Sequence, residues 1–180
     1  MEIHLPDFVI AKLYKNNLVI ASSSNELVLP SETSFKDKEI NTIAESPQLH
    51  WLGENKRNIS IVLNDADNVF IGEKELQFLS NILAACKFNV SDVAIINLAK
   101  TPANFEQIIE TAKSRFVLLF GIDEKKFPLP QPLGLFENKL MNHVSCLNSP
   151  PLESMMQPTS EAKALKTKLW HELKTLFQLN

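Results

Sequence analysis

The sequence predicts an α/β fold of three layers around a central, mainly parallel sheet of four strands. Beyond residue 58, short apolar runs alternate with segments of helical periodicity, a pattern typical of strand–helix–strand units. One run, residues 116–120, is apolar throughout, which favours a parallel strand covered on both faces. The 180 residues and 44% hydrophobic content are sufficient to fill one core.

The predicted strands are runs rich in β-branched and large apolar side chains, which suit a buried pleated surface. They comprise residues 59–63, 93–98, 116–120 and 143–147. Turn-forming residues follow the first, third and fourth runs. Between the last two strands, residues 121–142 are predicted to be irregular, because prolines alternate from Pro128 to Pro132 and favour extended backbone.

Three helices are predicted between and after these strands. Residues 73–87 place apolar side chains at helical spacing. Thr101 as N-cap and Pro102 at the first helical position predict a second helix that ends near residue 114. The last helix begins at Thr159, and Trp170 within it is interpreted as a core residue rather than a partner anchor. Its core-facing side chains are Ala162, Leu165, Leu169, Leu173 and Leu176.

The first 57 residues differ from the α/β core, which is predicted for residues 58–180. Residues 1–30 combine a short helix that begins near Pro6 with two short apolar runs, so they predict an N-terminal helix and strand extension. Residues 31–57 are mostly polar and charged and are interpreted as a linker or a cover over the core.

Composition excludes several classes of function. The four glycines lie far apart, whereas phosphate-cradling loops need clustered glycines. A formal net charge of −3 gives no electrostatic footprint for strong nucleic-acid binding. Cys86 and Cys146 form neither a disulfide framework nor a zinc motif. We find no secretory signal and no apolar run of spanning length, so a cytoplasmic protein without membrane contact is expected.

Polar residues that follow the predicted strands are candidate functional residues, because ligands of parallel sheets bind at these ends. Asp65 and Asp67 have the chemistry of a general base or a metal ligand, although such residues more often bond the backbone of a turn. The four histidines lack metal-ligand spacing, so no metal and no cofactor is expected. His143 is the one histidine considered as an acid or base.

Three stretches together resemble the psi subunit of bacterial DNA polymerase III, a clamp-loader accessory protein. Residues 59–65 resemble the first core strand of that family, which closes in an Asn-Asp pair. Residues 79–100 resemble its helix, short turn and next strand. A Ser-Pro turn at 149–152 and a Leu-Trp helix at 159–173 complete the resemblance, which spans most of residues 59–176. It implies a fold similar to that of uracil-DNA glycosylase.

The resemblance also implies a role for the N-terminal segment, which docks on the clamp-loader collar in psi proteins. The expected contacts are Phe8, Leu13, Tyr14, Leu18 and Ile20. Psi proteins often carry a tryptophan followed by Arg and Pro in this segment, whereas this chain has Leu18 and then Ala21-Ser22. The implied partners are clamp-loader subunits and a chi-like subunit.

Catalytic groups of the glycosylases are missing from the corresponding loops. After the first strand those enzymes have a Gly-x-Asp-Pro-Tyr type loop, whereas this chain keeps an acid without the Gly, Pro and aromatic residue. Their His-Pro-Ser-Pro turn corresponds to residues 147–150, where leucine replaces the histidine. We therefore expect a non-catalytic adaptor with a vestigial crevice, made of Asn64, Asp65, Asp67 and Ser149.

Two alternatives stay open at the level of sequence. One is a divergent glycosylase-type enzyme in which Asp65 or Asp67 activates water. The other is an α/β domain that binds a small ligand. The adaptor predicts recovery with clamp-loader subunits, the enzyme predicts uracil release, and the third predicts a co-purifying metabolite.

Overall fold

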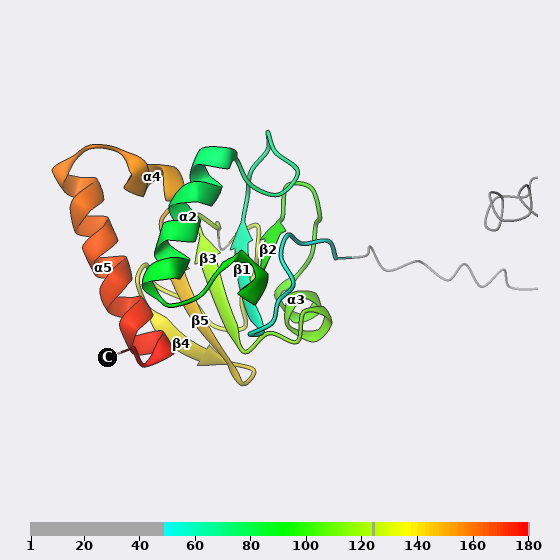
Figure 1. Ribbon diagram of the computed structural model, residues 1–180. Helices are drawn as coiled ribbons and strands as arrows, with labels where there is room; N and C mark the ends of the chain where they lie inside the picture. The colour runs from blue at the N-terminus through cyan, green and yellow to red at the C-terminus, as the bar shows by residue number, and fades with distance from the viewer. Residues whose placement is uncertain (1–48, 124, 180) are drawn as a thin grey trace, which may run out of the picture. The chain divides into compact units, whose positions relative to one another are not determined.

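The computed structural model describes residues 49–123 and 125–179, which form a mixed sheet of five strands with helices on both faces (Figure 1). The predicted N-terminal extension, including Phe8, Leu13, Tyr14, Leu18 and Ile20, lies outside these residues. The same holds for residues 31–48 of the predicted linker.

The strand order in the sheet is β2-β1-β3-β5-β4. Parallel pairs join β2 to β1, β1 to β3 and β3 to β5, whereas β4 runs antiparallel to β5 at the edge. The α/β class and the mainly parallel sheet are thus confirmed. The strand bounds are Ile59–Leu63 for β1, Val93–Asn97 for β2, Phe116–Phe120 for β3, Asn138–Met141 for β4 and Val144–Ser149 for β5.

The predicted count of four strands is wrong, because β4 lies within the stretch expected to be irregular. Strand β4 is short and half polar, and its exposed Leu140 reaches solvent at the sheet edge, so its sequence carries no buried-strand pattern. Asn142 and His143 both have positive φ, at 47° and 66°, and form the two-residue turn into β5. His143 therefore belongs to the turn, and the predicted strand begins at Val144 instead.

Alternating side chains of the strands divide the core into two halves. On one face, Ile61 and Leu118 contribute to a cluster that α2 (Glu73–Ala85), α4 (Leu152–Met156) and α5 (Ser160–Phe177) cover. On the other face, Val62 and Leu119 pack with α3 (Phe105–Thr111) and with buried side chains of the proline-rich loop, such as Phe127.

Local side-chain caps explain where two of the four α-helices of the described residues begin, α3 and α5. Helix α5 begins at the predicted place, and Thr159 is its N-cap, since its Oγ1 accepts a hydrogen bond from the Ala162 N–H at 3.1 Å. The predicted start of α3 at Thr101 is wrong. Asn104 caps that helix instead, because its side chain and that of Gln107 bond each other's backbone N–H in a capping box.

Within the described part of the chain, no helix combines the length and the apolar character needed to cross a membrane.

Candidate functional site

The carboxyl ends of β1 and β3 lie side by side at the point where the chain connections diverge. Helix α2 connects β1 to β2 on one face of the sheet, whereas α3 connects β2 to β3 on the other. Open α/β sheets bind ligands at such a switch point. The loops that follow β1 and β3 therefore form the first candidate site, which we call the carboxyl-edge crevice.

Two cavities meet in this crevice and share Asn64 and Gly121. The cavity on the α2 side has a volume of about 240 Å³, and the one on the α3 side about 380 Å³. Asp65, Glu75 and Glu153 line the smaller cavity, which has no basic side chain in its wall. This wall is therefore unfavourable for the phosphates of a nucleic acid.

The carboxylate of Asp65 bonds its own loop. Its Oδ1 accepts hydrogen bonds from the N–H groups of Asp67 and Asn68, both at 3.0 Å. Its Oδ2 accepts from Asn68 Nδ2 at 2.9 Å and from the Gly72 N–H at 3.1 Å, at the start of α2. Partial burial acts to raise the pKa of Asp65, but these hydrogen bonds outweigh it, so the pKa lies below its ordinary value. A low pKa makes Asp65 a weak general base.

Asn97 holds the same loop from the end of β2. Its side chain is almost fully buried, at 1% exposure. The Oδ1 accepts from the N–H of Asp65 at 2.9 Å and from that of Ala99 at 3.1 Å. The Nδ2 donates to the carbonyls of Asp65, Asn68 and Val69, at 2.7, 2.9 and 3.2 Å. The sequence placed Asn97 at a strand end but gave no signal of these five contacts.

The other two residues of the predicted crevice lie apart from the cavities. Asp67 is exposed on the loop and lines neither cavity. Ser149 is 2% exposed, and its buried Oγ has no hydrogen-bond partner among the described residues. The structure therefore brings Asn64 and Asp65 to the crevice and leaves Asp67 and Ser149 outside its walls.

Outside the carboxyl-edge crevice, the described residues contain no cluster of cysteine, histidine or acidic side chains suited to catalysis or metal binding. Burial raises the pKa of Cys86 to about 11 and that of Cys146 to about 12, so both thiols are protonated at neutral pH. His143 lies exposed in the β4–β5 turn. Among residues 49–123 and 125–179, no group of three or more His, Cys, Asp or Glu is arranged to hold a metal ion.

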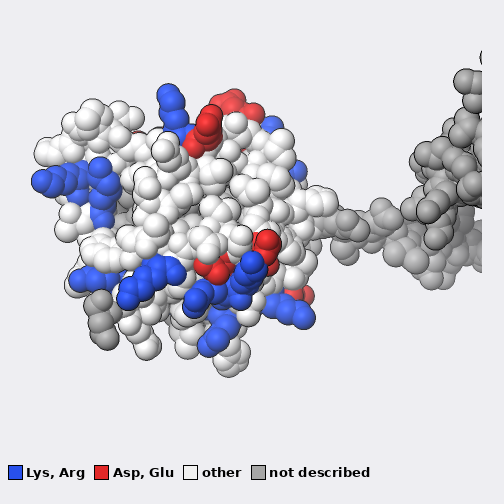
Figure 2. All heavy atoms as spheres, viewed as in Figure 1, with Lys and Arg blue, Asp and Glu red and all other residues white. Residues whose placement is uncertain are grey.

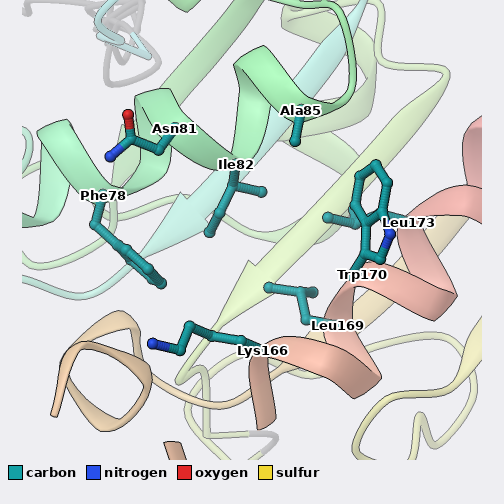
Figure 3. A pocket seen from close by; sticks show the side chains of 8 residues that line it. All are labelled: Phe78, Asn81, Ile82, Ala85, Lys166, Leu169, Trp170 and Leu173. Atoms are coloured by element: carbon teal, nitrogen blue, oxygen red, sulfur yellow. The ribbon is translucent and has the colours of Figure 1, made fainter. Parts of the chain in front are cut away.

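A second candidate site, the α2–α5 groove, lies on the face that Figure 2 turns to the viewer. It has a volume of about 250 Å³ and is lined almost entirely by apolar atoms. In Figure 3 the side chains of Phe78 and Ile82 extend from α2 toward α5, and that of Trp170 extends from α5 toward α2. The lining residues are Phe78, Asn81, Ile82 and Ala85 from α2, and Lys166, Leu169, Trp170 and Leu173 from α5.

Sequence reasoning missed this groove. Trp170, interpreted as a core residue, is 37% exposed. Its position about 100° from Leu169 on the helix was the available signal, because one of the two side chains had to leave the centre of the apolar face. The sequence did not show that α2 and α5 leave an open groove between them.

No protein-family model and no curated protein sequence matches the chain.

Proposed function

We propose that the protein is a non-catalytic protein–protein adaptor that works like the psi subunit of DNA polymerase III. In this role it joins a clamp loader to a partner subunit during DNA replication. The ordered resemblance over residues 59–176 motivates the proposal, and the bonding of Asp65 is the observation that carries it.

A water-activating carboxylate needs a free oxygen lone pair directed at the substrate. Both oxygens of Asp65 already accept two hydrogen bonds each, all from residues 67–72 of its own loop. Beside it, Glu75 and Glu153 add negative charge to the cavity wall. Of the two acids that a glycosylase-type reaction could use, Asp65 is thus committed to holding the loop, and Asp67 lies exposed outside both cavities. Both observations support a scaffold whose function lies in its contacts.

The test is affinity purification of the tagged full-length chain from extracts of its own cells, followed by mass spectrometry. We expect clamp-loader subunits to be recovered. Deletion of residues 1–24 is expected to abolish recovery, while circular dichroism shows that the core stays folded. As a matched control, Lys168→Ala changes an exposed side chain of α5 and is expected to leave recovery unchanged. Recovery of no clamp-loader subunit by the full-length chain contradicts the proposal.

The enzyme alternative has a direct assay. A glycosylase-type enzyme releases uracil from single-stranded DNA, and Asp65→Asn and Asp67→Asn would lower the rate. On the adaptor proposal, the full-length chain releases no uracil even at high protein concentration. Release that depends on either aspartate would replace the adaptor by the enzyme.

One observation favours a small-ligand-binding domain as a second candidate. The two cavities of the carboxyl-edge crevice meet at Asn64 and Gly121, at the switch point where α/β sheets bind ligands. Native mass spectrometry of protein purified from its own cells tests this candidate. A bound metabolite that Asn64→Leu removes would support it, because Asn64 is exposed and lines both cavities, whereas a protein mass equal to that of the chain alone would remove it.

A further inference from the structure

The α2–α5 groove exposes apolar side chains, whereas the solvent-facing side of a helix is usually polar. Leu169 and Leu173 form its base and are almost fully buried, whereas Phe78 and Ile82 are only partly buried on the α2 side. Trp170 stands at the α5 rim with 37% of its surface exposed. Clustered apolar side chains around an exposed tryptophan are typical of a binding surface rather than of a free helix face.

Charge along the groove is one-sided. Lys166 lines the groove. At 100° per residue, Lys163 and Lys174 lie on the same side of α5, within about 40° of Trp170 around the helix axis. The acidic residues of α5 project from the opposite side, and Glu172 there accepts a hydrogen bond from Asn138 Nδ2 at 2.6 Å. No acidic side chain lines the groove. Figure 2 shows Lys side chains along α5 without Asp or Glu beside them on this face.

We propose that the α2–α5 groove binds an amphipathic helix of a partner protein. Apolar side chains of that helix, spaced at i, i+3 or i+4 and i+7, enter between Phe78 and Trp170, while its Asp and Glu residues face the lysines of α5. A groove between two helices offers no strand edge to extend, so a helix rather than a strand fits it. The inference rests on the proposed function only in requiring a protein partner.

Two other possible occupants of the groove, a second copy of the chain and its own N-terminal segment, complement the positive charge of the α5 lysines less well. A second copy of the chain would bring its own α5 lysines against Lys163, Lys166 and Lys174, and like charges across an interface are unfavourable. The predicted N-terminal helix of this chain carries Lys12 and Lys15 against a single acid, Asp7. An acidic helix from another protein complements the lysine rim, whereas these two do not.

The experiment uses two labelled synthetic helices of about 18 residues with the same leucine pattern, one flanked by Glu and one by Lys. Fluorescence anisotropy with the full-length chain measures their binding. We expect the Glu-flanked peptide to bind, with an affinity that falls as salt is added, and the Lys-flanked peptide to bind at least about tenfold more weakly. Equal binding of the two peptides, or binding of neither, overturns the proposal.

Charge exchange distinguishes the groove from any other surface. The triple variant Lys163→Glu, Lys166→Glu, Lys174→Glu is expected to lose about tenfold or more of its affinity for the Glu-flanked peptide and to gain affinity for the Lys-flanked one. Trp170→Ala is expected to weaken both. Lys168→Glu, on the opposite side of α5, is the matched control and is expected to change affinity less than about twofold. A loss caused equally by Lys168→Glu places the binding elsewhere.

The other occupants give different results. Self-association in sedimentation that Trp170→Ala abolishes would assign the groove to a second copy. Tighter peptide binding after deletion of residues 1–30 would assign it to the N-terminal segment. Either result overturns the proposal. Peptide binding without clamp-loader recovery would overturn the proposed function alone, whereas recovery without peptide binding would overturn the groove alone.

Discussion

The carboxyl-edge crevice and the α2–α5 groove differ in what their side chains are free to do. In the crevice, Asp65 and Asn97 have the polarity expected of a binding site, but nine hydrogen bonds tie them to residues of their own and neighbouring loops. In the groove, few polar atoms are present, yet Trp170 and Phe78 keep apolar surface that nothing in the described part of the chain covers.

This difference teaches that the chemistry of a residue type does not by itself identify a site. A carboxylate whose acceptors are filled contributes to the loop's stability and offers little to a ligand. An apolar side chain left in water costs free energy that a partner could recover. The predictions below test which region carries structure and which carries binding.

The largest expected effect comes from removing the base of the groove. Leu169→Ala deletes a side chain that is 2% exposed in the α2–α5 half of the core and leaves a cavity. We expect it to lower the free energy of unfolding by about 3 kcal/mol. Urea denaturation followed by circular dichroism measures this. A loss under about 1 kcal/mol would show that the groove is open enough to collapse around the smaller side chain.

Asn97→Ala tests whether the crevice is held together by polar contacts. The variant removes five hydrogen bonds and leaves buried backbone groups of the loop after β1 without partners. We expect a loss of about 2 kcal/mol in the free energy of unfolding. Asn64→Ala on the same loop is the control, because its side chain is exposed, and it should change stability by less than about 0.5 kcal/mol. Equal effects would mean that Asn97 does not organise the loop.

Trp170→Ala sharpens the contrast within α5. Trp170 is 37% exposed, whereas the neighbouring Leu169 is buried. We expect the tryptophan variant to lose less than about 1 kcal/mol of stability while it loses peptide binding in the experiment described above. A stability loss as large as that of Leu169→Ala would mean that Trp170 acts as a core residue and would contradict its assignment to binding.

The smallest expected effect concerns the charge of Asp65. Its pKa in the folded chain lies below the value in the unfolded chain, so it contributes stability above the unfolded pKa that is lost as pH falls through the folded pKa. Asp65→Asn should therefore reduce the loss of stability between neutral pH and acid. Because the carboxylate reaches solvent, the difference should stay under about 1 kcal/mol. Urea titrations at pH 7 and pH 3 compare the two chains, and parallel pH profiles would contradict the assigned hydrogen bonds.

Much of the fold could be predicted because its periodicity is local. The apolar runs at β1, β2 and β3 are buried in the sheet, and the 3.6-residue pattern of α2 and α5 faces the core as expected. Strand β4 could not be predicted, because an edge strand with an exposed Leu140 owes its structure to pairing with β5. The start of α3 was missed because Asn104 and Gln107 form a better cap than Thr101.

The candidate sites divide in the same way. The crevice could be located from the sequence, because polar residues after β1 fall at the carboxyl end of a parallel sheet. For Asp65 the favoured expectation, bonding of the turn backbone, is confirmed by its hydrogen bonds from the N–H groups of Asp67 and Asn68. The contacts with Gly72 and with Asn97, which reaches the loop from 32 positions along the chain, could not be predicted. The groove had only one local signal, the position of Trp170 about 100° from Leu169 on the helix, because it exists only where α2 and α5 lie next to each other.

The sequence alone determined the α/β class, the parallel strands β1, β2 and β3 and the apolar face of α5, since each follows from side chains a few positions apart. Tertiary structure decided which groups remain available. Asn97 and Asp65 are bonded within the fold because backbone groups distant in sequence lie next to them. Trp170 stays exposed because it lies at the rim of the groove between α2 and α5. Hydrogen-bond satisfaction and packing depend on neighbours in space, which no spacing along the chain records.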